Sequence, residues 1–408
     1  MLTDGLPRGE AIRAAAAAYG GEHGRLVDLC VALQQIPAPT GDESERAAWV
    51  EERMRAIGLA DVERDELDNV YGRVPGLQAR PALLVSAHTD TVFPRETDLR
   101  LQRFSNGLLR GPGIGDNSTG VAGLLTLAET LVELAAPPVD IWLVANSMEE
   151  GLGDLRGMKR VVDRFHADGS AAGAGGRGVL GAALVIEGMG LGRIVHQALG
   201  VRRYRTSATA PGGHSWGDFG AASAVHGLVA VAQEIVNLQV PHTPRTSFNI
   251  GRIGGGTSIN TIAQEAWMEL DLRSASPETL IWLDGQVQRI IERRVEAHRV
   301  CDDGLTLCHE QIGHRPAGEL PFEHPLVQAA CTVLHELGIE ERSDARISST
   351  DANVPLSRNI PAVCVGLTDG GDVHRLSEWI DPLPLVKGMQ QLLYLTWWSA
   401  AWLTTHSA

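Results

Sequence analysis

The chain has few of the features that mark membrane proteins and disulfide-rich proteins. Its 408 residues include only five cysteines, Cys30, Cys301, Cys308, Cys331 and Cys364. They are too scattered for a CxxC zinc site or a disulfide framework, and they suit a reducing compartment. No segment reaches the roughly 18 uninterrupted apolar residues of a membrane span, so we expect no membrane partner.

Basic residues are also scarce. The 35 lysines and arginines are outnumbered by 50 aspartates and glutamates, which gives a formal net charge of −15, and no basic run is present. A nucleic-acid partner is therefore not expected. The Ala-rich segment 1–24 lacks the basic region and the strongly apolar region of a secretion signal, so we expect a cytoplasmic location.

Two stretches that resemble other kinds of site are incomplete. The glycine-rich GPGIG at 111–115 lacks both the GK[ST] ending and the GxGxxG pattern of nucleotide-binding loops. The hydrophobic tail segment 392–404 is short and follows Pro382 and Pro384. We therefore predict a packed terminal helix there rather than a membrane contact.

The sequence does contain ample apolar material, enough for two domains. The chain is longer than a usual single domain, and 44% of its residues are hydrophobic. Continuous apolar runs at 81–87, 139–147, 182–188 and 360–366 are typical of strands buried on both faces. They predict an α/β fold with a mainly parallel sheet flanked by helices. A helix is expected from Ser118, with Asn117 or Ser118 as its cap.

The middle of the chain has a different pattern. Segments 201–210, 246–255 and 265–274 alternate apolar and polar residues, and helices are expected at about 221–238 and 277–299. This pattern favours an antiparallel sheet with helices on one face. We therefore predict an α/β domain formed by 1–198 and 313–408, interrupted by a smaller α+β domain at 199–312. The Gly/Ala-rich segment 167–178 predicts a flexible loop.

Polar residues follow the apolar runs where the predicted strands end. Ligands of open α/β sheets bind beyond the carboxyl ends of the strands. A lone histidine after a strand is more often structural, and a Glu-Glu pair is more often solvated, but here several such residues coincide. The set comprises His88, Asp90, Glu149, Glu150, Glu187 and His374 after strands, and Asp116 in a glycine-rich turn before a helix.

Carboxylates gathered at one sheet edge are costly without cations, because like charges repel and the acids become protonated. Two Zn²⁺ ions would be neutralised by Asp116, Glu150, Glu187 and one hydroxide. Zinc accepts such a mixed nitrogen and oxygen set, as manganese and cobalt also can.

The two remaining carboxylates have other expected roles. Asp90 is placed to accept the second N–H of the His88 ring, as carboxylates often do beside metal-bound imidazoles. Glu149 lies beside Glu150 but points differently, so it is a candidate general base.

Five motifs then occur in a specific order. They are SAHTDTVFP, GPGIGDNSTGVAGLL, NSMEEGLGDLRG, VIEG and a late DVH. Over roughly residues 25–395 they resemble the co-catalytic zinc metallopeptidases of clan MH, which include peptidase T, glutamate carboxypeptidase, aminoacylase and acetylornithine deacetylase. HTDTVFP and EEGLGDLRG are most similar to the peptidase T-like members.

The resemblance implies a role for each residue of the set. Glu149 would be the general base acting on a water that bridges two metals, and Asp90 would orient His88. Thr350 and Asp351 would support the site without binding metal. The implied metal ligands are His88 and Glu187 for one ion, Glu150 and His374 for the other, and Asp116 between them.

The resemblance also gives the inserted domain a role as a lid that mediates homodimerisation. His214, in APGGHSWGD, would reach the partner subunit's site and stabilise an oxyanion; taken alone it would be a turn residue. Asn260 and Arg273 would contact a substrate carboxylate, a task that suits a guanidinium. Arg273 is alternatively a salt-bridge residue at a strand end.

The expected function is that of a dinuclear zinc metallopeptidase or amidohydrolase, an exopeptidase acting on small peptides. The alternative with the same chemistry is a deacylase of N-acyl amino acids. A non-catalytic metal- or ligand-binding homologue predicts loss of the base or of a ligand, whereas all of these positions are filled here. A scaffolding dimer would leave the gathered carboxylates unexplained.

Overall fold

The computed structural model describes residues 9–166, 179–342 and 346–405. The predicted loop at 167–178 lies outside the described residues. The chain divides into two compact units, a larger unit formed by 1–198 and 319–408 and an inserted unit formed by 199–318.

The larger unit is built on one mixed sheet. Its centre consists of parallel neighbours in the order β6-β3-β7-β18, which confirms the predicted α/β fold class. Antiparallel strands extend both edges. The strands along the sheet are β1 (Ala60–Arg64), β2 (Val70–Val74), β6 (Val139–Asn146), β3 (Gln78–His88), β7 (Leu180–Met189), β18 (Ala362–Gly371), β19 (Trp379–Asp381), β5 (Leu109–Arg110) and β4 (Gln102–Arg103), with β8 (Ile194–Val195) beside β18.

The central strands are continuous apolar runs because both of their faces are covered. Every residue of β6 is buried. The register places His88 opposite Asn146 and Glu187 opposite Gly366. The carboxyl ends of these strands therefore lie level along one edge of the sheet, where the predicted site residues begin.

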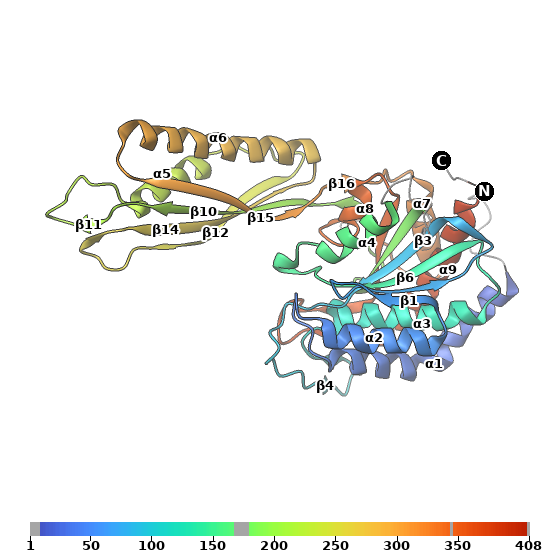
Figure 1. Cartoon of the computed structure of the whole chain (residues 1–408). Helices are drawn as coiled ribbons and strands as arrows, with labels where there is room; N and C mark the ends of the chain where they lie inside the picture. The colour runs from blue at the N-terminus through green and yellow to red at the C-terminus, as the bar shows by residue number, and fades with distance from the viewer. Residues whose placement is uncertain (1–8, 167–178, 343–345, 406–408) are drawn as a thin grey trace. The chain divides into compact units, whose positions relative to one another are not determined.

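Helices cover both faces of this sheet (Figure 1). The helix α3 (Gly120–Glu133) packs on one face and α4 (Arg156–His166) on the other. Buried leucines and alanines of α3 pack into the main core with the central strands. The other helices of this unit are α1 (Glu10–Gln34), α2 (Ser44–Ile57), α7 (Pro325–Glu336), α8 (Asn353–Ser357) and α9 (Leu385–Leu403).

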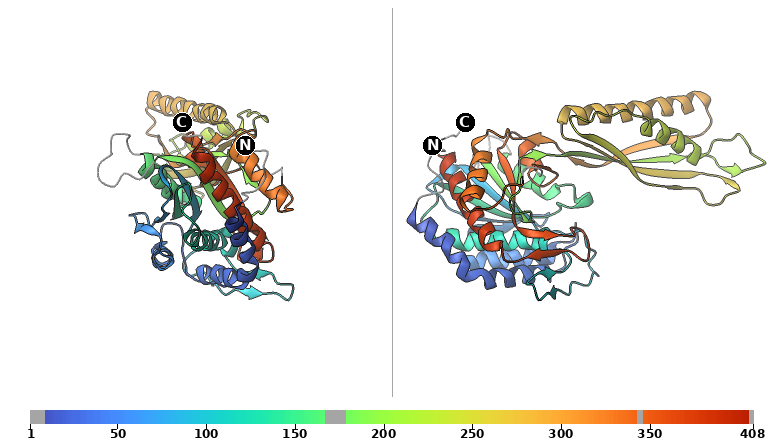
Figure 2. Two further views of the ribbon diagram at one scale, coloured as in Figure 1. Left: turned by 90° about the vertical axis from the view of Figure 1, so that its right-hand side faces the viewer. Right: turned by 180° about the vertical axis from the view of Figure 1, so that it is seen from behind.

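The predicted terminal helix is α9, which is packed and contacts α1, α7 and β18 (Figure 2). Its residues Leu392, Leu393 and Leu395 are fully buried. Its hydrophobic surface therefore contributes to the core. Among the described residues, no helix combines the length and the apolar character that crossing a membrane requires.

The inserted unit contains an antiparallel sheet in the order β12-β14-β10-β15, with the helices α5 and α6 on one face (Figure 1). Alternate residues of β14 are buried beneath these helices, as the sequence pattern predicts. The elements are β10 (Gly200–Thr209), α5 (Ala224–Val236), β12 (Thr246–Gly255), β14 (Glu265–Ser274), α6 (Pro277–Cys301) and β15 (Thr306–Arg315), with a small β11 (Gly213–His214) and β13 (Thr261–Ile262) pair.

The strand β15 was not among the predicted strands. It is an edge strand, and most of its residues are half-buried or exposed, with polar residues at Thr306, His309, Glu310, Gln311, His314 and Arg315, so it has no strong apolar alternation. Residue 312 lies inside β15, and the compact unit continues to Gly318.

Candidate metal centre

Asp116 lies between two histidines that are far apart in the sequence. Its Oδ1 is 3.1 Å from Nε2 of His88, and its Oδ2 is 3.1 Å from Nε2 of His374. His88 is buried at the end of β3, whereas the side chain of His374 is 51% exposed. One carboxylate thus presents a different oxygen to each imidazole, as a ligand bridging two metal ions would.

Two glutamates complete the two halves of this arrangement. Glu150 Oε1 lies 2.9 Å from His374 Nε2, and Glu187 Oε2 lies 3.6 Å from His88 Nε2. Within each group of potential ligands, the ligand atoms lie within 4.8 Å of one another. The groups are His88, Asp116 and Glu187; Asp116, Glu150 and His374; and His88, Glu149 and Glu150.

Neighbouring groups and burial shift the pKa values of the cluster's histidines and glutamates. Hydrogen bonds to Asp116 and Glu150 raise the pKa of His374 to about 10. Burial acts to lower the pKa of His88, but its carboxylate partners outweigh burial and leave that pKa well above its usual value. Burial raises the pKa values of Glu150 and Glu187.

This donor set fits two divalent ions. The carboxylates concentrate negative charge in a mostly buried region, and imidazole nitrogens face them at contact distances. Cations at these positions would replace the protons that the histidines otherwise hold. Mixed imidazole and carboxylate ligands are typical of zinc, and manganese and cobalt accept them as well.

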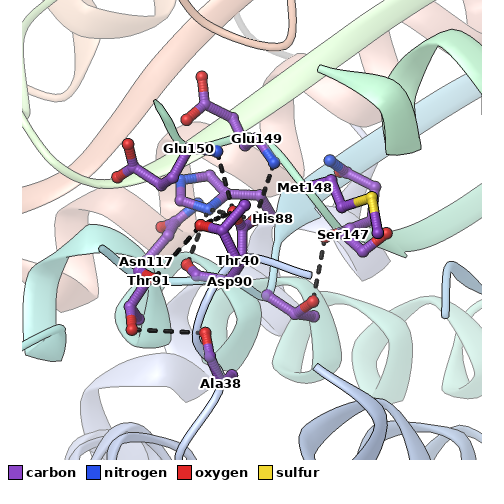
Figure 3. Close-up of polar contacts among 12 residues, drawn as sticks. Ala38, Thr40, His88, Asp90, Thr91, Asn117, Ser147, Met148, Glu149 and Glu150 are labelled. Carbon is purple, nitrogen blue, oxygen red and sulfur yellow. Dashed lines mark hydrogen bonds and ion pairs between the residues drawn. The ribbon is translucent and has the colours of Figure 1, made fainter. Parts of the chain in front are cut away.

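Asp90 is fully buried and contacts both the first histidine and the turn after β6. Its Oδ1 lies 3.5 Å from Nδ1 of His88, and its backbone oxygen lies 3.2 Å from the same nitrogen. Its side-chain oxygens also accept hydrogen bonds from the backbone N–H groups of Glu149 and Glu150, each at 2.9 Å (Figure 3). Asp90 therefore contacts the backbone of Glu149 and Glu150 as well as the imidazole that it was predicted to orient.

Glu149 and Glu150 present their carboxylates away from Asp90, while their backbone nitrogens face it (Figure 3). Both side chains are buried, with exposures of 5% and 6%. A carboxylate oxygen of Glu149 lies within the ligand group of His88 and Glu150. This location allows Glu149 to exchange a proton with a molecule held between the ligands.

The turn that carries Asp116 is held by two residues that the sequence analysis did not assign to the site. The buried Glu378 accepts hydrogen bonds on Oε1 from the N–H groups of Gly115 and Asp116, at 2.8 and 2.9 Å. Glu378 lies four residues after His374, and that proximity was the available clue. The Asp116–Asn117 peptide is cis.

Asn117 connects this turn to β7. Its Nδ2 donates to Ile186 O at 2.8 Å, and its Oδ1 accepts from the N–H groups of Gly188 and Gly120. The backbone is non-helical at Asp116 (φ −110°, ψ 89°) and Asn117 (φ −133°, ψ 36°), and α3 begins at Gly120, two residues after the predicted start. The side chain of Asn117 still caps the N–H of Gly120.

Thr350 and Asp351 lie near the site but outside the groups of potential ligands among the described residues. Asp351 is fully buried and accepts a hydrogen bond from Asn146 Nδ2 at 2.7 Å. Asn146 is the last residue of β6, immediately before the turn that carries Glu149. This contact agrees with a supporting role.

The remaining predicted site residues belong to the inserted unit. His214 is exposed on β11, and its Nδ1 accepts hydrogen bonds from the N–H groups of Trp216 and Gly217 at 3.2 Å. Asn260 is exposed, and its Oδ1 accepts a hydrogen bond from Ser258. Arg273 donates through Nε to Asp271 Oδ2 at 2.6 Å, and its side chain remains 41% exposed.

Residues 84–397 match Peptidase family M20/M25/M40. The chain belongs to this family. Family membership confirms the resemblance noted in the sequence and the predicted enzyme class, a metal-dependent hydrolase of amide bonds.

Individual relatives of the M20/M25/M40 family cover nearly the whole chain. A succinyl-diaminopimelate desuccinylase from Corynebacterium glutamicum is 27% identical over 87% of this chain and 91% of its own length. A tripeptidase from Staphylococcus aureus matches 93% of this chain and 99% of its own, with a TM-score of 0.73 and 20% identity.

A dinuclear metal-binding M20 peptidase from Bacillus subtilis matches 94% of this chain and 99% of its own, with a TM-score of 0.66 and 16% identity. The solved structures share the fold of this chain.

Proposed function

We propose that the protein is an exopeptidase that cleaves small peptides at a dinuclear zinc site, with Glu149 as the general base. The observation that carries the proposal is the position of Asp116, whose two oxygens face His88 and His374 at 3.1 Å each. Glu187 and Glu150 complete the two ligand groups, and Glu149 lies within reach of both His88 and Glu150.

When bound, two divalent ions would supply Lewis acidity and lower the pKa of a water molecule. Glu149 would take a proton from the attacking water as its oxygen bonds to the amide carbon. Glu149 would then donate that proton to the amine nitrogen as the C–N bond breaks. Asp90 would hold His88 and the backbone of Glu149 in the positions that these steps require.

The hydrogen bonds of His214 support its proposed role. Its Nδ1 accepts two backbone N–H groups, so the neutral ring carries its proton on Nε2. That N–H can stabilise the oxyanion that develops on the substrate. We propose that it does so in the active site of a partner subunit.

Homodimerisation through the inserted unit is supported by exposed apolar side chains near His214. Trp216, Phe219 and Ile259 are 88%, 91% and 102% exposed. Analytical ultracentrifugation tests the dimer, and a monomer at all concentrations would contradict it.

Asn260 and Arg273 are proposed to contact a substrate carboxylate. The pairing of Arg273 with Asp271 agrees equally with the salt-bridge alternative, but its guanidinium is exposed enough to bind an anion as well. A substrate with a free carboxylate is what an exopeptidase or an N-acyl amino acid deacylase would bind.

A deacylase is the second candidate function, favoured by the desuccinylase relative that spans 87% of this chain. The two candidates are separated by a panel of di- and tripeptides, N-acetyl amino acids and N-succinyl amino acids, assayed with zinc or cobalt. Turnover of the peptides, abolished by a chelator and restored by metal, is the expected result. Turnover of the acylated amino acids alone would overturn the peptidase assignment.

We also propose a cytoplasmic location for the protein. All five cysteines are free thiols, as in a reducing compartment, and Cys30 and Cys364 are buried. Cell fractionation with an antibody tests this location.

A further inference from the structure

The backbone of the turn that carries Glu149 is held by side chains. The turn follows the end of β6, where the sheet no longer supplies hydrogen-bond partners. Four consecutive N–H groups donate to side-chain oxygens at 2.9 to 3.0 Å. These bonds run from Ser147 to Asn69, from Met148 to Glu43, and from Glu149 and Glu150 to Asp90.

Met148 has an unusual backbone conformation. Its φ is 55°, which is uncommon for a residue with a side chain and costs conformational energy. The N–H of Met148 itself donates to Glu43, and the N–H of the next residue, Glu149, donates to Asp90. The two carboxylates thus hold the peptide planes on both sides of Met148, directly before the proposed base.

Glu43 reaches this turn from a distant part of the chain. It occupies the N-cap position of α2, yet its side chain forms no hydrogen bond with the first turn of that helix. Its Oε1 accepts instead from Met148 at 3.0 Å and from the N–H of Gly41 at 2.9 Å. The side chain is only 1% exposed, so the contact with Met148 is made without competition from bulk water.

The segment before Glu43 is anchored to the same region. The buried Arg46 donates to Ile36 O and to Thr89 O, at 3.1 and 2.8 Å. Thr40 donates through Oγ1 to Asp90 Oδ2 at 2.9 Å (Figure 3). These hydrogen bonds fix the segment that carries Glu43, and the bond from Met148 to Glu43 therefore fixes the turn relative to that segment.

We propose that Glu43 is a positioning residue that orients Glu149 by fixing the conformation of Met148. The inference rests on the proposed function, in which Glu149 is the general base. Loss of the contact frees the N–H of Met148 and allows its backbone to relax, which turns Glu149. The backbone N–H of Glu150 remains held by Asp90, so this proposed metal ligand keeps its place.

The test uses two variants of Glu43, one that changes the length of the side chain and one that changes its charge. Glu43→Asp keeps the charge but is too short to reach Met148, and it should lower kcat by about 10- to 100-fold with bound metal unchanged. Glu43→Gln keeps an acceptor oxygen at the same reach, and it should retain kcat within about threefold. Glu52→Ala, an exposed position on the same helix, is the matched control.

Substitution of Met148 tests the same geometry without changing Glu43. Valine resists a positive φ, so Met148→Val should lower kcat while metal content is retained. Glycine adopts this φ without strain, so Met148→Gly should keep kcat near that of the wild type. If Glu43→Asp does not fold, the comparison of Met148→Val with Met148→Gly tests whether the conformation of Met148 controls kcat.

Wild-type kcat in Glu43→Asp, or an equal loss in Glu43→Asp and Glu43→Gln, would overturn the proposal. So would a loss of kcat that merely follows a loss of metal. Glu149→Gln is assayed in parallel: if that variant is fully active, the proposed function itself fails. If it is inactive while Glu43→Asp and Met148→Val are active, only the role of Glu43 fails.

Discussion

Oδ2 of Asp116 lies 3.1 Å from Nε2 of His374, while the other oxygen of the same carboxylate faces His88. The two residues come from a turn before α3 and from the loop after β18. The contact therefore joins opposite parts of the larger unit's chain at one point. One carboxylate is thus common to both groups of potential ligands, His88 with Glu187 and His374 with Glu150.

Replacing Asp116 with Asn should disrupt the shared site, because an amide offers one good acceptor oxygen where the carboxylate offers two. We expect bound metal to fall below two ions per chain and turnover to fall by more than about 100-fold, beyond the loss typical of outer contacts. Metal analysis together with a peptide assay checks this. Asp28→Asn, at a side chain that is 80% exposed, is the control; full activity of the Asp116 variant would contradict the bridging role.

Glu149→Gln should separate metal binding from turnover. The amide cannot take up the proton of the attacking water, so we expect turnover to fall by about 100- to 10,000-fold. The metal content should remain that of the wild type, because the proposed ligands are intact. Turnover assays and metal analysis on the same preparation give both readings. Unchanged turnover would remove Glu149 from the mechanism.

Mixed dimers test whether His214 acts across subunits. A preparation of Glu149→Gln and one of His214→Ala should each have low activity, with metal retained. After the two are mixed and allowed to exchange subunits, one site of each mixed dimer holds Glu149 and receives His214 from its partner. Activity should therefore be regained on mixing, and an inactive mixture of confirmed mixed dimers would argue for action within one subunit.

Metal binding should become tighter as the pH rises. Hydrogen bonds to Asp116 and Glu150 raise the pKa of His374 to about 10, so the metal-free ring is protonated at neutral pH. A metal requires the neutral ring, so binding must release that proton, and affinity should increase from about pH 6 to pH 8. Calorimetry in two buffers of different ionisation enthalpy measures the proton release. Identical heats in both buffers would show that no proton is released.

Glu43→Gln should stabilise the protein at high pH. Burial raises the pKa of Glu43 to about 7, so the folded state favours the protonated form. The stability associated with that proton is present below the usual glutamate pKa and is lost as the pH rises through about 7. The neutral Gln avoids this loss, which is on the order of 3 kcal/mol. Thermal unfolding at pH 5 and pH 8 should show an advantage for the variant that grows with pH.

Much of the larger unit could be predicted from local sequence. The runs around β3, β6, β7 and β18 are apolar throughout, and that pattern indicates strands buried on both faces. The edge strand β15 could not be predicted in this way, because an edge strand with a polar, partly exposed surface lacks a strong hydrophobic period. The helix α3 begins at Gly120, two residues after the predicted start, because the backbone at Asp116 and Asn117 is not helical.

Some residues of the candidate site could likewise be predicted from the sequence, and others could not. Residues that directly follow strands, such as His88 and Glu187, were identified from the sequence, since parallel strands bring their carboxyl ends to one edge. Glu378 and Glu43 were not, because they act by accepting backbone N–H groups from turns far away in the chain. Glu43 has the sequence appearance of any acidic residue at the start of a helix. For Glu378, the only hint in the sequence was its position four residues after His374.

The sequence by itself determined the order of the motifs, the α/β class and the residue types that can hold metal, because these depend on side-chain chemistry and on hydrophobic period. Only the tertiary structure decided which oxygen of Asp116 faces which histidine, and which buried carboxylates hold the turns around them. Those relationships depend on distances of about 3 Å between atoms from separate segments, and hydrogen bonds require that closeness. Packing of the whole core brings the segments into contact.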